Sequence, residues 1–177
     1  MTKTELRRMM RQRKQTIARE VLDSLSANIV EALCQIQEWK SANTVLLYYS
    51  LPDEVATHSL VVTAAAEGKT VLLPRVVGDD LTLHRYDGDD SLRLGAFGIQ
   101  ESAGPIFDDY EKIDLAIVPG VAFTIRGERL GRGRGYYDRL LPRLPRAKKI
   151  GLCWPLQIVE ELPTDAHDML MDVVFCG

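Results

Sequence analysis

One stretch of the chain, residues 113–139, limits the possible folds more than any other. It begins as a near-continuous apolar strand at 113–118, turns at Pro119-Gly120 and then alternates arginine and glycine before Tyr136. Glycines at 131, 133 and 135 lack Cβ atoms, so the backbone can approach a ligand closely and present its N–H groups. A helix that begins near Gly135 adds the positive end of its dipole. The stretch therefore predicts a buried strand followed by an anion site, and phosphate is the anion that suits it best.

Three arginines, Arg129, Arg132 and Arg134, add fixed positive charge to this loop. The loop differs from a Walker A phosphate loop, because no Lys-Ser or Lys-Thr pair follows Gly135 and the spacing is not G-x-G-x-x-G. From these residues alone two interpretations stay open: an anion-binding loop, or a mobile surface loop rich in arginine and glycine.

Apolar segments elsewhere in the chain alternate between strand and helix periods. Buried strands are predicted at 44–49, 70–73, 113–118, 149–153 and 171–176, and helices at 25–39, 57–68, from 135 onward and at 156–162. This alternation indicates an α/β protein with a parallel sheet. A half-exposed strand at 81–86 is predicted as an antiparallel edge, and residues 87–112 as mainly irregular loop, with Phe97-Gly98-Ile99 as a lip over a pocket.

The first helix is predicted to begin almost at the first residue, because Thr2 and Glu5 have the spacing of a capping box. Its apolar side chains, from Leu6 to Val21, recur roughly at the helical period, and the arginines lie on the opposite face. Residues 1–19 contain seven basic side chains and one acid. The segment is therefore predicted as a basic amphipathic helix.

Composition bounds the class of protein. A chain of 177 residues suffices for one well-buried domain, and 46% hydrophobic with 27% charged residues is typical of a folded protein rather than a disordered one. The net charge of −3 disfavours a wholly basic nucleic-acid-binding protein. Three cysteines without metal-binding spacing indicate free thiols in a reducing compartment, and the basic start lacks the apolar segment of a signal peptide. No apolar run is long enough to span a membrane, so we expect a cytoplasmic protein.

Polar segments follow several of the predicted strands at the same end. Residues 50–54, residues 119–137 and Trp154 each come directly after a strand. In an open α/β sheet, ligands bind beyond the carboxyl ends of the strands. We therefore expect these three segments to meet in one pocket.

Several motifs, taken together, resemble those of a known family. They are Lys3-x-x-x-Arg7, Asp53-Glu54-Val55-x-Thr57, Pro119-Gly-Val-Ala-Phe123 and Arg129-Leu-Gly-Arg-Gly-Arg-Gly-Tyr-Tyr-Asp138. In this order they closely resemble the 5-formyltetrahydrofolate cyclo-ligases, also called 5,10-methenyltetrahydrofolate synthetases, from about Lys3 to Val174. The resemblance implies one domain over residues 1–177, folded as a three-layer sandwich with a mostly parallel, Rossmann-like central sheet.

The same resemblance implies a reaction. It is the ATP- and Mg2+-dependent cyclisation of 5-formyltetrahydrofolate to 5,10-methenyltetrahydrofolate, with release of ADP and phosphate. A formamide oxygen is a poor leaving group, so the family's route first phosphorylates it; N10 then attacks the activated carbon and phosphate departs. Phosphoryl transfer depends mainly on positioning and charge neutralisation, which explains the need for an arginine-rich loop.

Expected roles of single residues also come from the resemblance. The nucleotide would be bound by the first helix and the glycine loop, through Lys3, Arg7, Arg129, Leu130, Gly131, Arg132, Gly133, Arg134, Gly135, Tyr136 and Tyr137. Among these, Arg132, Arg134 and Tyr136 would be catalytic, with the two arginines stabilising charge on the transferred group. The family often has Lys or Gly at the position of Arg134.

Folate and metal ligands complete the expected site. The folate would be bound by Tyr49, Glu54, Arg132, Tyr136 and Trp154. Glu54 can accept two N–H bonds from the pterin, and aromatic rings offer it a flat apolar surface. Asp138 and Asp172 match metal-binding positions, and Asp172 is equally open to interpretation as a strand-entry residue. His167 is expected to fix a loop by hydrogen bonding.

Two other classes of function stay open from the sequence. One is a nucleic-acid-binding module that uses the basic helix and the Arg-Gly loop; the other is a folate-binding protein without turnover. Net acidity and the lack of an RNA-binding aromatic motif stand against the first. The presence of the expected phosphate and metal ligands stands against the second, since a protein that only binds folate needs neither; these residues are Lys3, Arg7, Arg132 and Asp138. We expect 5-formyltetrahydrofolate, with or without a polyglutamate tail, as the partner of a monomer that binds neither nucleic acid nor membrane.

Overall fold

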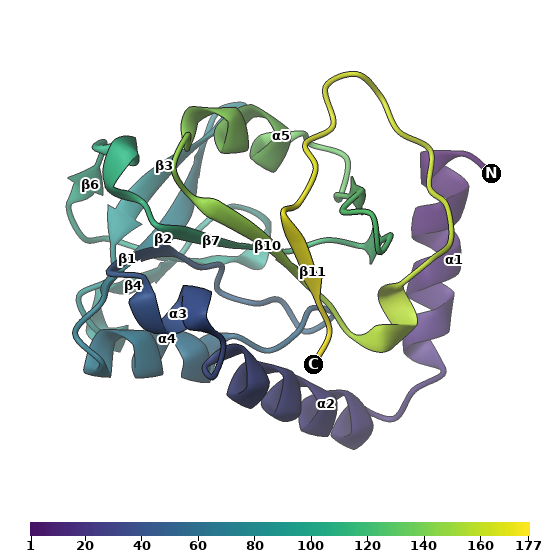
Figure 1. Cartoon of the computed structure of the whole chain (residues 1–177), viewed down its shortest axis with the longest axis horizontal. Helices are drawn as coiled ribbons and strands as arrows, with labels where there is room; N and C mark the ends of the chain where they lie inside the picture. Colours follow the sequence, from purple (N-terminus) through teal and green to yellow (C-terminus); the bar gives the residue numbers. More distant parts are fainter.

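A seven-stranded sheet forms the centre of the fold, in the order β11-β10-β7-β1-β2-β3-β6. The computed structural model describes residues 1–177 and is drawn in Figure 1. The sheet consists of β1 (Thr44–Leu46), β2 (Thr70–Val77), β3 (Asp80–Arg85), β6 (Ile106–Phe107), β7 (Leu115–Val118), β10 (Lys148–Leu152) and β11 (Val173–Phe175). Neighbouring strands from β11 to β2 run parallel, whereas β3 is antiparallel to both β2 and β6. The predicted α/β fold with a mostly parallel sheet is confirmed.

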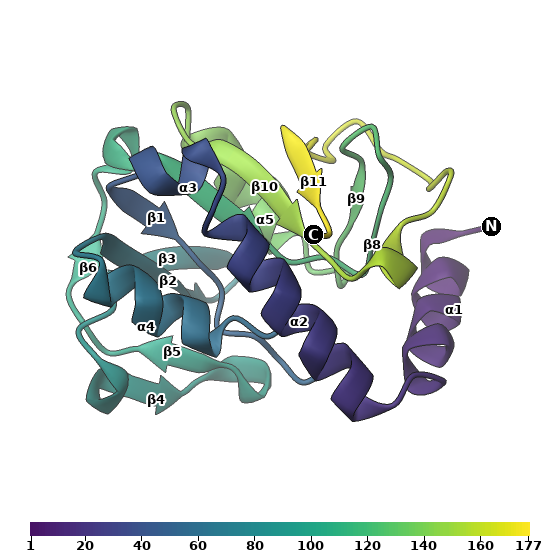
Figure 2. The same ribbon diagram turned by 60° about the horizontal axis from the view of Figure 1, so that its bottom comes forward.

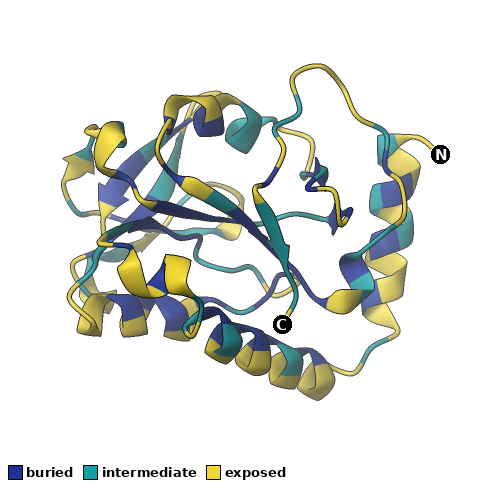
Figure 3. Ribbon diagram, in the orientation of Figure 1, coloured by how far each residue is buried: buried dark blue, intermediate teal, exposed yellow.

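Helices cover both faces of this sheet, as Figures 1 and 2 show. One face carries α2 (Arg19–Leu33), α3 (Gln37–Ser41) and α4 (His58–Ala66), and the other carries α5 (Tyr136–Leu140). Successive strand residues point to opposite faces, so Val45 and Leu47 pack on the side of α2 while Leu46 packs on the side of α5. Figure 3 shows the resulting buried layers along the central strands and the inner sides of the helices.

The first helix, α1 (Lys3–Gln15), lies beside one end of the sheet rather than on either face (Figure 1). Its buried Leu6 and Met10 pack against a hairpin formed by β8 (Ala122–Phe123) and β9 (Arg129–Leu130). The Thr2–Glu5 capping box is present at its start. Because the glycine loop directly follows β9, this packing places the amino-terminal half of α1 next to that loop.

Helix boundaries differ from the sequence predictions at two places near the amino terminus. The first helix ends at Gln15, and α2 begins at Arg19 instead of residue 25. Val21 does not extend the apolar stripe of α1, because it is 49% exposed on the outer side of α2. Trp39 belongs to the separate helix α3 and is buried there.

The predicted helix at 156–162 is wrong. Only a short 3-10 turn forms, at Pro155–Gln157, and the chain is extended after it. Ile158 makes a parallel bridge to Phe123, and the Val159 N–H donates to the Phe123 carbonyl. The segment therefore satisfies its backbone by pairing with β8, a long-range contact that local periodicity cannot show.

Three further predictions of the middle region need correction. Strand β2 continues past residue 73 to Val77, because β3 pairs with it along this whole extension. Strand β3 is not an edge, since β6 covers it. Residues 87–112 are not mainly irregular: they include the hairpin of β4 (Leu92–Leu94) and β5 (Gln100–Ser102).

None of the helices in the structure combines the length and the apolar character needed to cross a membrane.

Candidate functional site

A cavity of about 1360 Å³ opens at the carboxyl ends of β1 and β7. Its wall is formed by α1, the loop after β1, the tip of the β4–β5 hairpin, the glycine loop and the loop before β11. The wall contains the predicted residues Lys3, Arg7, Tyr49, Glu54, Arg129, Leu130, Gly131, Arg132, Gly133, Arg134, Gly135, Tyr136, Tyr137 and Asp138. Segments that lie far apart in sequence therefore meet in one pocket at the predicted edge of the sheet.

The glycine loop follows a backbone path that two of its glycines permit. Gly133 and Gly135 have φ angles of +106° and +71°, which L side chains rarely adopt. Gly135 is the N-cap of α5, so the predicted helix start is confirmed. Arg7 donates a hydrogen bond from Nε to the Gly131 carbonyl oxygen at 2.8 Å. This bond ties the loop to α1.

Arg129 and Asp138 form an ion pair at the base of the loop. Arg129 has a side chain only 3% exposed, and its Nη2 lies 3.1 Å from Asp138 Oδ1. Its Nη1 donates to the Pro119 carbonyl oxygen, while its buried Nε has no hydrogen-bond partner. Asp138 Oδ1 also accepts the N–H of Met169 at 3.2 Å. One carboxylate oxygen of Asp138 is thus fixed, and Oδ2 has no donor from the protein.

A second acidic segment, which sequence reasoning missed, lies in the loop between β10 and β11. Lys3 Nζ is 2.7 Å from Asp165 Oδ2 and 2.6 Å from Asp168 Oδ2, and all three residues line the cavity. Burial alone raises the pKa of Asp168, but hydrogen bonds from Lys3 and the Asp165 N–H outweigh it and lower the pKa below its usual value. The sequence could have indicated these residues, because the connection from β10 to β11 begins at the carboxyl edge of the sheet, where ligands bind.

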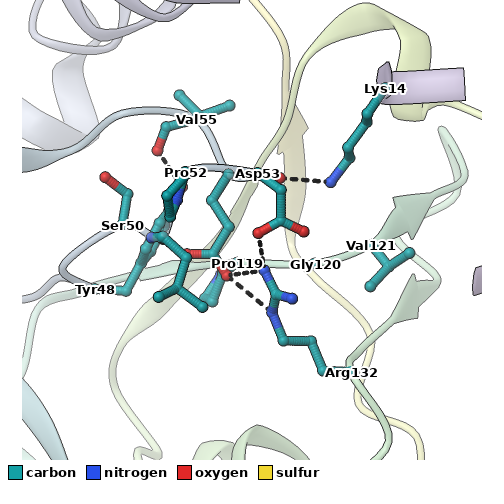
Figure 4. Close-up of polar contacts among 12 residues, drawn as sticks. Lys14, Tyr48, Ser50, Pro52, Asp53, Val55, Pro119, Gly120, Val121 and Arg132 are labelled. Atoms are coloured by element: carbon teal, nitrogen blue, oxygen red, sulfur yellow. Dashed lines mark hydrogen bonds and ion pairs between the residues drawn. The ribbon is translucent and has the colours of Figure 1, made fainter. Parts of the chain in front are cut away.

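Acidic and basic groups also meet on the opposite wall, shown in Figure 4. Arg132 contacts Glu54 Oε1 through Nε at 3.2 Å and Nη2 at 3.0 Å, and its Nη2 lies 2.6 Å from Asp53 Oδ1. Glu54 Oε2 accepts the N–H of Leu51 at 2.8 Å. Burial raises the pKa of Glu54 more than these donors lower it, whereas for Asp53 the hydrogen bond and charge of Arg132 outweigh burial and lower the pKa.

The predicted lip is an aromatic tip on the β4–β5 hairpin. Phe97 and Ile99 both line the cavity. Phe97 has a positive φ of 58°, which is unusual for a residue with a side chain. Its ring lies 4.7 Å from the guanidinium carbon of Arg134 and 6.4 Å, between centroids, from the ring of Tyr136. The lip therefore contacts the glycine loop across the cavity.

Three side chains with expected roles lie elsewhere or make other contacts. Trp154 does not line the cavity: it is 1% exposed in the core, and its Nε1 donates to Ser26 Oγ at 3.0 Å. Asp172 is also absent from the wall, because it lies before β11 at the amino end, where its Oδ2 accepts the Lys149 N–H at 2.7 Å. The strand-entry interpretation of Asp172 therefore fits the structure. His167 lines the cavity but forms no hydrogen bond, so it does not fix its loop in the expected way.

An α/β enzyme with its site at the carboxyl edge of a parallel sheet is the class that this fold and cavity define. Within that class, the chain belongs to the 5-formyltetrahydrofolate cyclo-ligase family, whose model matches residues 1–177. The resemblance inferred from the motifs is confirmed.

Known proteins share both sequence and fold with this chain. The NMR structure of 5,10-methenyltetrahydrofolate synthetase from Aquifex aeolicus is 36% identical, with a TM-score of 0.88 over 99% of this chain and 89% of that one. A Schizosaccharomyces pombe protein named probable 5-formyltetrahydrofolate cyclo-ligase is 33% identical over 190 residues, which cover 97% of this chain and 93% of the relative. A 5,10-methenyltetrahydrofolate synthetase from Mycoplasma pneumoniae, 24% identical with a TM-score of 0.79 over 98% of both chains, has the same fold.

Proposed function

We propose that the protein uses ATP and Mg2+ to close 5-formyltetrahydrofolate to 5,10-methenyltetrahydrofolate, with release of ADP and phosphate. One observation carries the proposal: a single cavity joins a cationic glycine loop to the buried carboxylate of Glu54. The loop suits the phosphates of a nucleotide, and the carboxylate suits the N–H groups of a pterin. The names of the related proteins supply the substrate.

The proposed chemistry has two transfers. The formyl oxygen attacks the γ-phosphorus of ATP and ADP leaves; N10 then attacks the activated formyl carbon, the C–O bond to phosphate breaks, and the N10 proton is released to water. Arg132 and Arg134 neutralise charge on the transferred phosphoryl group. Lys3 and Arg7 hold the nucleotide from α1, which Arg7 ties to the glycine loop, and Arg129 holds it from β9 at the base of that loop. Tyr136 lies at the boundary between nucleotide and folate, near the lip.

Magnesium, which supplies charge neutralisation at the phosphates, fits the acidic groups on this wall. Mg2+ commonly uses one or two carboxylates together with phosphate oxygens and waters. Asp138 offers Oδ2, while its Oδ1 is held by Arg129 and the Met169 N–H. Asp168, the neighbour of Met169 in sequence, also lines the cavity. We assign Asp138 and Asp168 as the candidate pair in place of Asp172, which lies off the cavity wall.

Folate is assigned to the wall that carries Glu54 and Tyr49. Tyr49 lines the cavity and stacks on His58 with 3.8 Å between ring centroids, so its ring plane is held. Arg132 contacts the Oε1 atom of Glu54 that a pterin N–H would use. Folate binding therefore requires Arg132 to turn from Glu54 toward the phosphates. This movement would couple occupation of the folate site to neutralisation of the transferred group.

Glu54→Gln is expected to weaken folate binding by roughly 10- to 100-fold, because hydrogen bonds to a charged acceptor are worth about 1.5–3 kcal/mol. ATP affinity should change much less than folate affinity, because Glu54 reaches the nucleotide wall only through Arg132. In the unmodified protein, folate affinity should fall as the pH drops through the raised pKa of Glu54, above the usual 4.5. The variant should lack this pH dependence.

Calorimetric titration of folate and of ATP, across pH, measures both effects. The exposed Glu20→Gln on α2 is the matched control, and it should change neither affinity. If Glu54→Gln lost ATP binding and kept folate binding, the assignment of the two walls would be wrong.

The nucleic-acid alternative has little support in the structure. Two basic side chains of α1 that do not line the cavity are engaged within the molecule: Arg13 donates to the Leu156 carbonyl oxygen and Lys14 to the Asp53 carbonyl oxygen. Tighter binding of single-stranded RNA than of ATP, with a steep salt dependence, would favour that alternative. A cytoplasmic location, a monomeric state and acceptance of polyglutamate tails stay part of the proposal.

Turnover tests the proposal directly. Purified protein mixed with Mg-ATP and 5-formyltetrahydrofolate should form the methenyl product, whose near-ultraviolet absorbance can be followed continuously. Binding of folate with no product at any pH would instead support a folate-binding protein without turnover.

A further inference from the structure

Lys14, near the carboxyl end of α1, is a buried cation outside the cavity wall. Only 8% of the residue is exposed, although lysine is seldom buried unless it is paired. Its Nζ donates to the Asp53 carbonyl oxygen at 2.6 Å and lies 5.5 Å from the centroid of the Trp154 ring. Burial lowers the pKa of Lys14 despite the nearby carboxylates. From the sequence alone, Lys14 cannot be distinguished from the exposed basic residues of α1.

Its contact is to the loop that presents Glu54. In Figure 4, Lys14 approaches Asp53 from the side opposite to Arg132. A second cation, Arg19 at the start of α2, donates to the Pro52 carbonyl oxygen next to it. Inside the loop, the Glu54 N–H donates to the Leu51 carbonyl at 3.1 Å, and the Leu51 N–H donates back to the Glu54 carboxylate. The loop is therefore a closed turn, and its outer carbonyl oxygens accept hydrogen bonds from Lys14 and Arg19.

Charge also balances across this loop. Arg132 forms ion pairs with the carboxylates of Asp53 and Glu54, whereas Lys14 Nζ contacts the Asp53 carbonyl oxygen and is near enough to both carboxylates for their charges to act on it. The proposed reaction moves Arg132 toward phosphate, which would leave two adjacent carboxylates, one of them buried. A buried charge that loses its partner is strongly destabilising, so a cation that stays in place is needed beside them. Lys14 is held by its backbone contact and by packing on Trp154, and it meets that need.

We propose that Lys14 is a positioning residue, which fixes the loop of Asp53 and Glu54 to α1 and supplies the stationary positive charge beside these carboxylates when Arg132 contacts phosphate. The same helix carries Lys3 and Arg7 on the nucleotide wall. Lys14 thereby sets the distance between the nucleotide and folate walls through one rigid element. This role rests on the proposed function, because it concerns the placement of folate relative to ATP.

Three variants test the role. Lys14→Met keeps an unbranched stem against Trp154 and removes the ammonium, whereas Lys14→Arg keeps a positive charge. Arg13→Gln is the matched control: Arg13 precedes Lys14 on α1 and donates to the Leu156 carbonyl oxygen, away from the loop. For each protein the measurements are KM for 5-formyltetrahydrofolate, kcat, and ATP affinity by calorimetry without folate.

The expected result is a split between the two ligands. Lys14→Met should raise KM for the folate roughly tenfold or more, the effect of one lost charged hydrogen bond, and should change ATP affinity by less than about twofold. Lys14→Arg should recover most of the folate affinity, and Arg13→Gln should match the unmodified protein. Retained ATP binding in Lys14→Met also shows that the variant is folded.

Other outcomes contradict the role. An unchanged KM for the folate in Lys14→Met would mean that Lys14 only packs on Trp154. An equal loss in Arg13→Gln would mean that the effect is not specific to Lys14. Loss as large in Lys14→Arg as in Lys14→Met would rule out the positive charge as the cause. The unmodified protein, assayed alongside, separates the two proposals: no turnover there contradicts the proposed function, whereas turnover there with a normal Lys14→Met contradicts the role of Lys14 alone.

Discussion

Arg132→Ala is expected to lower kcat for the folate-dependent use of ATP by on the order of 10³-fold, the loss typical when a charge-stabilising group is removed from a phosphoryl-transfer site. The expected loss is large because Arg132 lies on the glycine loop and contacts the carboxylate of Glu54, the residue proposed to bind folate. Its side chain is 45% exposed, so the fold should tolerate the change. Steady-state rates of product formation, with thermal unfolding as the check on folding, measure both expectations.

Substitution of two other basic residues of the cavity, Lys3 and Arg134, should have different kinetic effects. Lys3→Ala should weaken ATP use mainly through KM for ATP, because Lys3 lies on the wall of α1. Arg134→Ala should lose less than Arg132→Ala, since Arg134 stacks on Phe97 and does not contact Glu54. Normal rates in both Arg132→Ala and Lys3→Ala would remove the phosphate site from this cavity.

Asp138→Asn is expected to have the second largest effect, on both activity and stability. It removes the charge of the proposed metal ligand, so kcat should fall by at least about 10²-fold. It also leaves the guanidinium of Arg129, 3% exposed, beside a neutral amide. Because a buried ion pair that loses one charge is costly, the free energy of unfolding should drop by about 1–3 kcal/mol. Chemical denaturation and the Mg2+ dependence of the rate measure the two effects.

Asp172→Asn is the matched control for that variant. Asparagine keeps an acceptor for the Lys149 N–H at the amino end of β11, so stability should change little. Because Asp172 lies away from the cavity, the Mg2+ requirement should be unchanged. Asp168→Asn should raise the Mg2+ requirement instead. A requirement raised by Asp172→Asn and unaffected by Asp168→Asn would reverse the assignment of the metal ligands.

Local patterns were sufficient for the central strands β1, β7 and β10 and for the glycine loop. The apolar run that ends at Val118 forms a strand with all four residues buried, since a central parallel strand has both faces covered. Gly135 caps α5 because a positive φ is needed where the loop enters the helix. In both cases the residues that determine the structure are neighbours in sequence.

Contacts between distant segments could not be predicted in the same way. Trp154 follows a strand at the correct edge, yet its ring turns into the core toward Ser26. Asp168 joins the wall because Met169 pairs with Asp138 across 31 positions of sequence. The 156–162 segment pairs with β8 and is therefore not helical. Each of these outcomes depends on a contact with a segment that is distant in sequence, and the periodicity of apolar residues carries no information about such contacts.

The central claim is that ATP and folate react with each other in this one cavity, and the ratio of products tests it most directly. With unmodified protein, Mg-ATP and 5-formyltetrahydrofolate, ADP and the methenyl product should form in equal amounts, and neither should form when one substrate is omitted. Formation of ADP without folate, or no methenyl absorbance with both substrates present, would contradict the account.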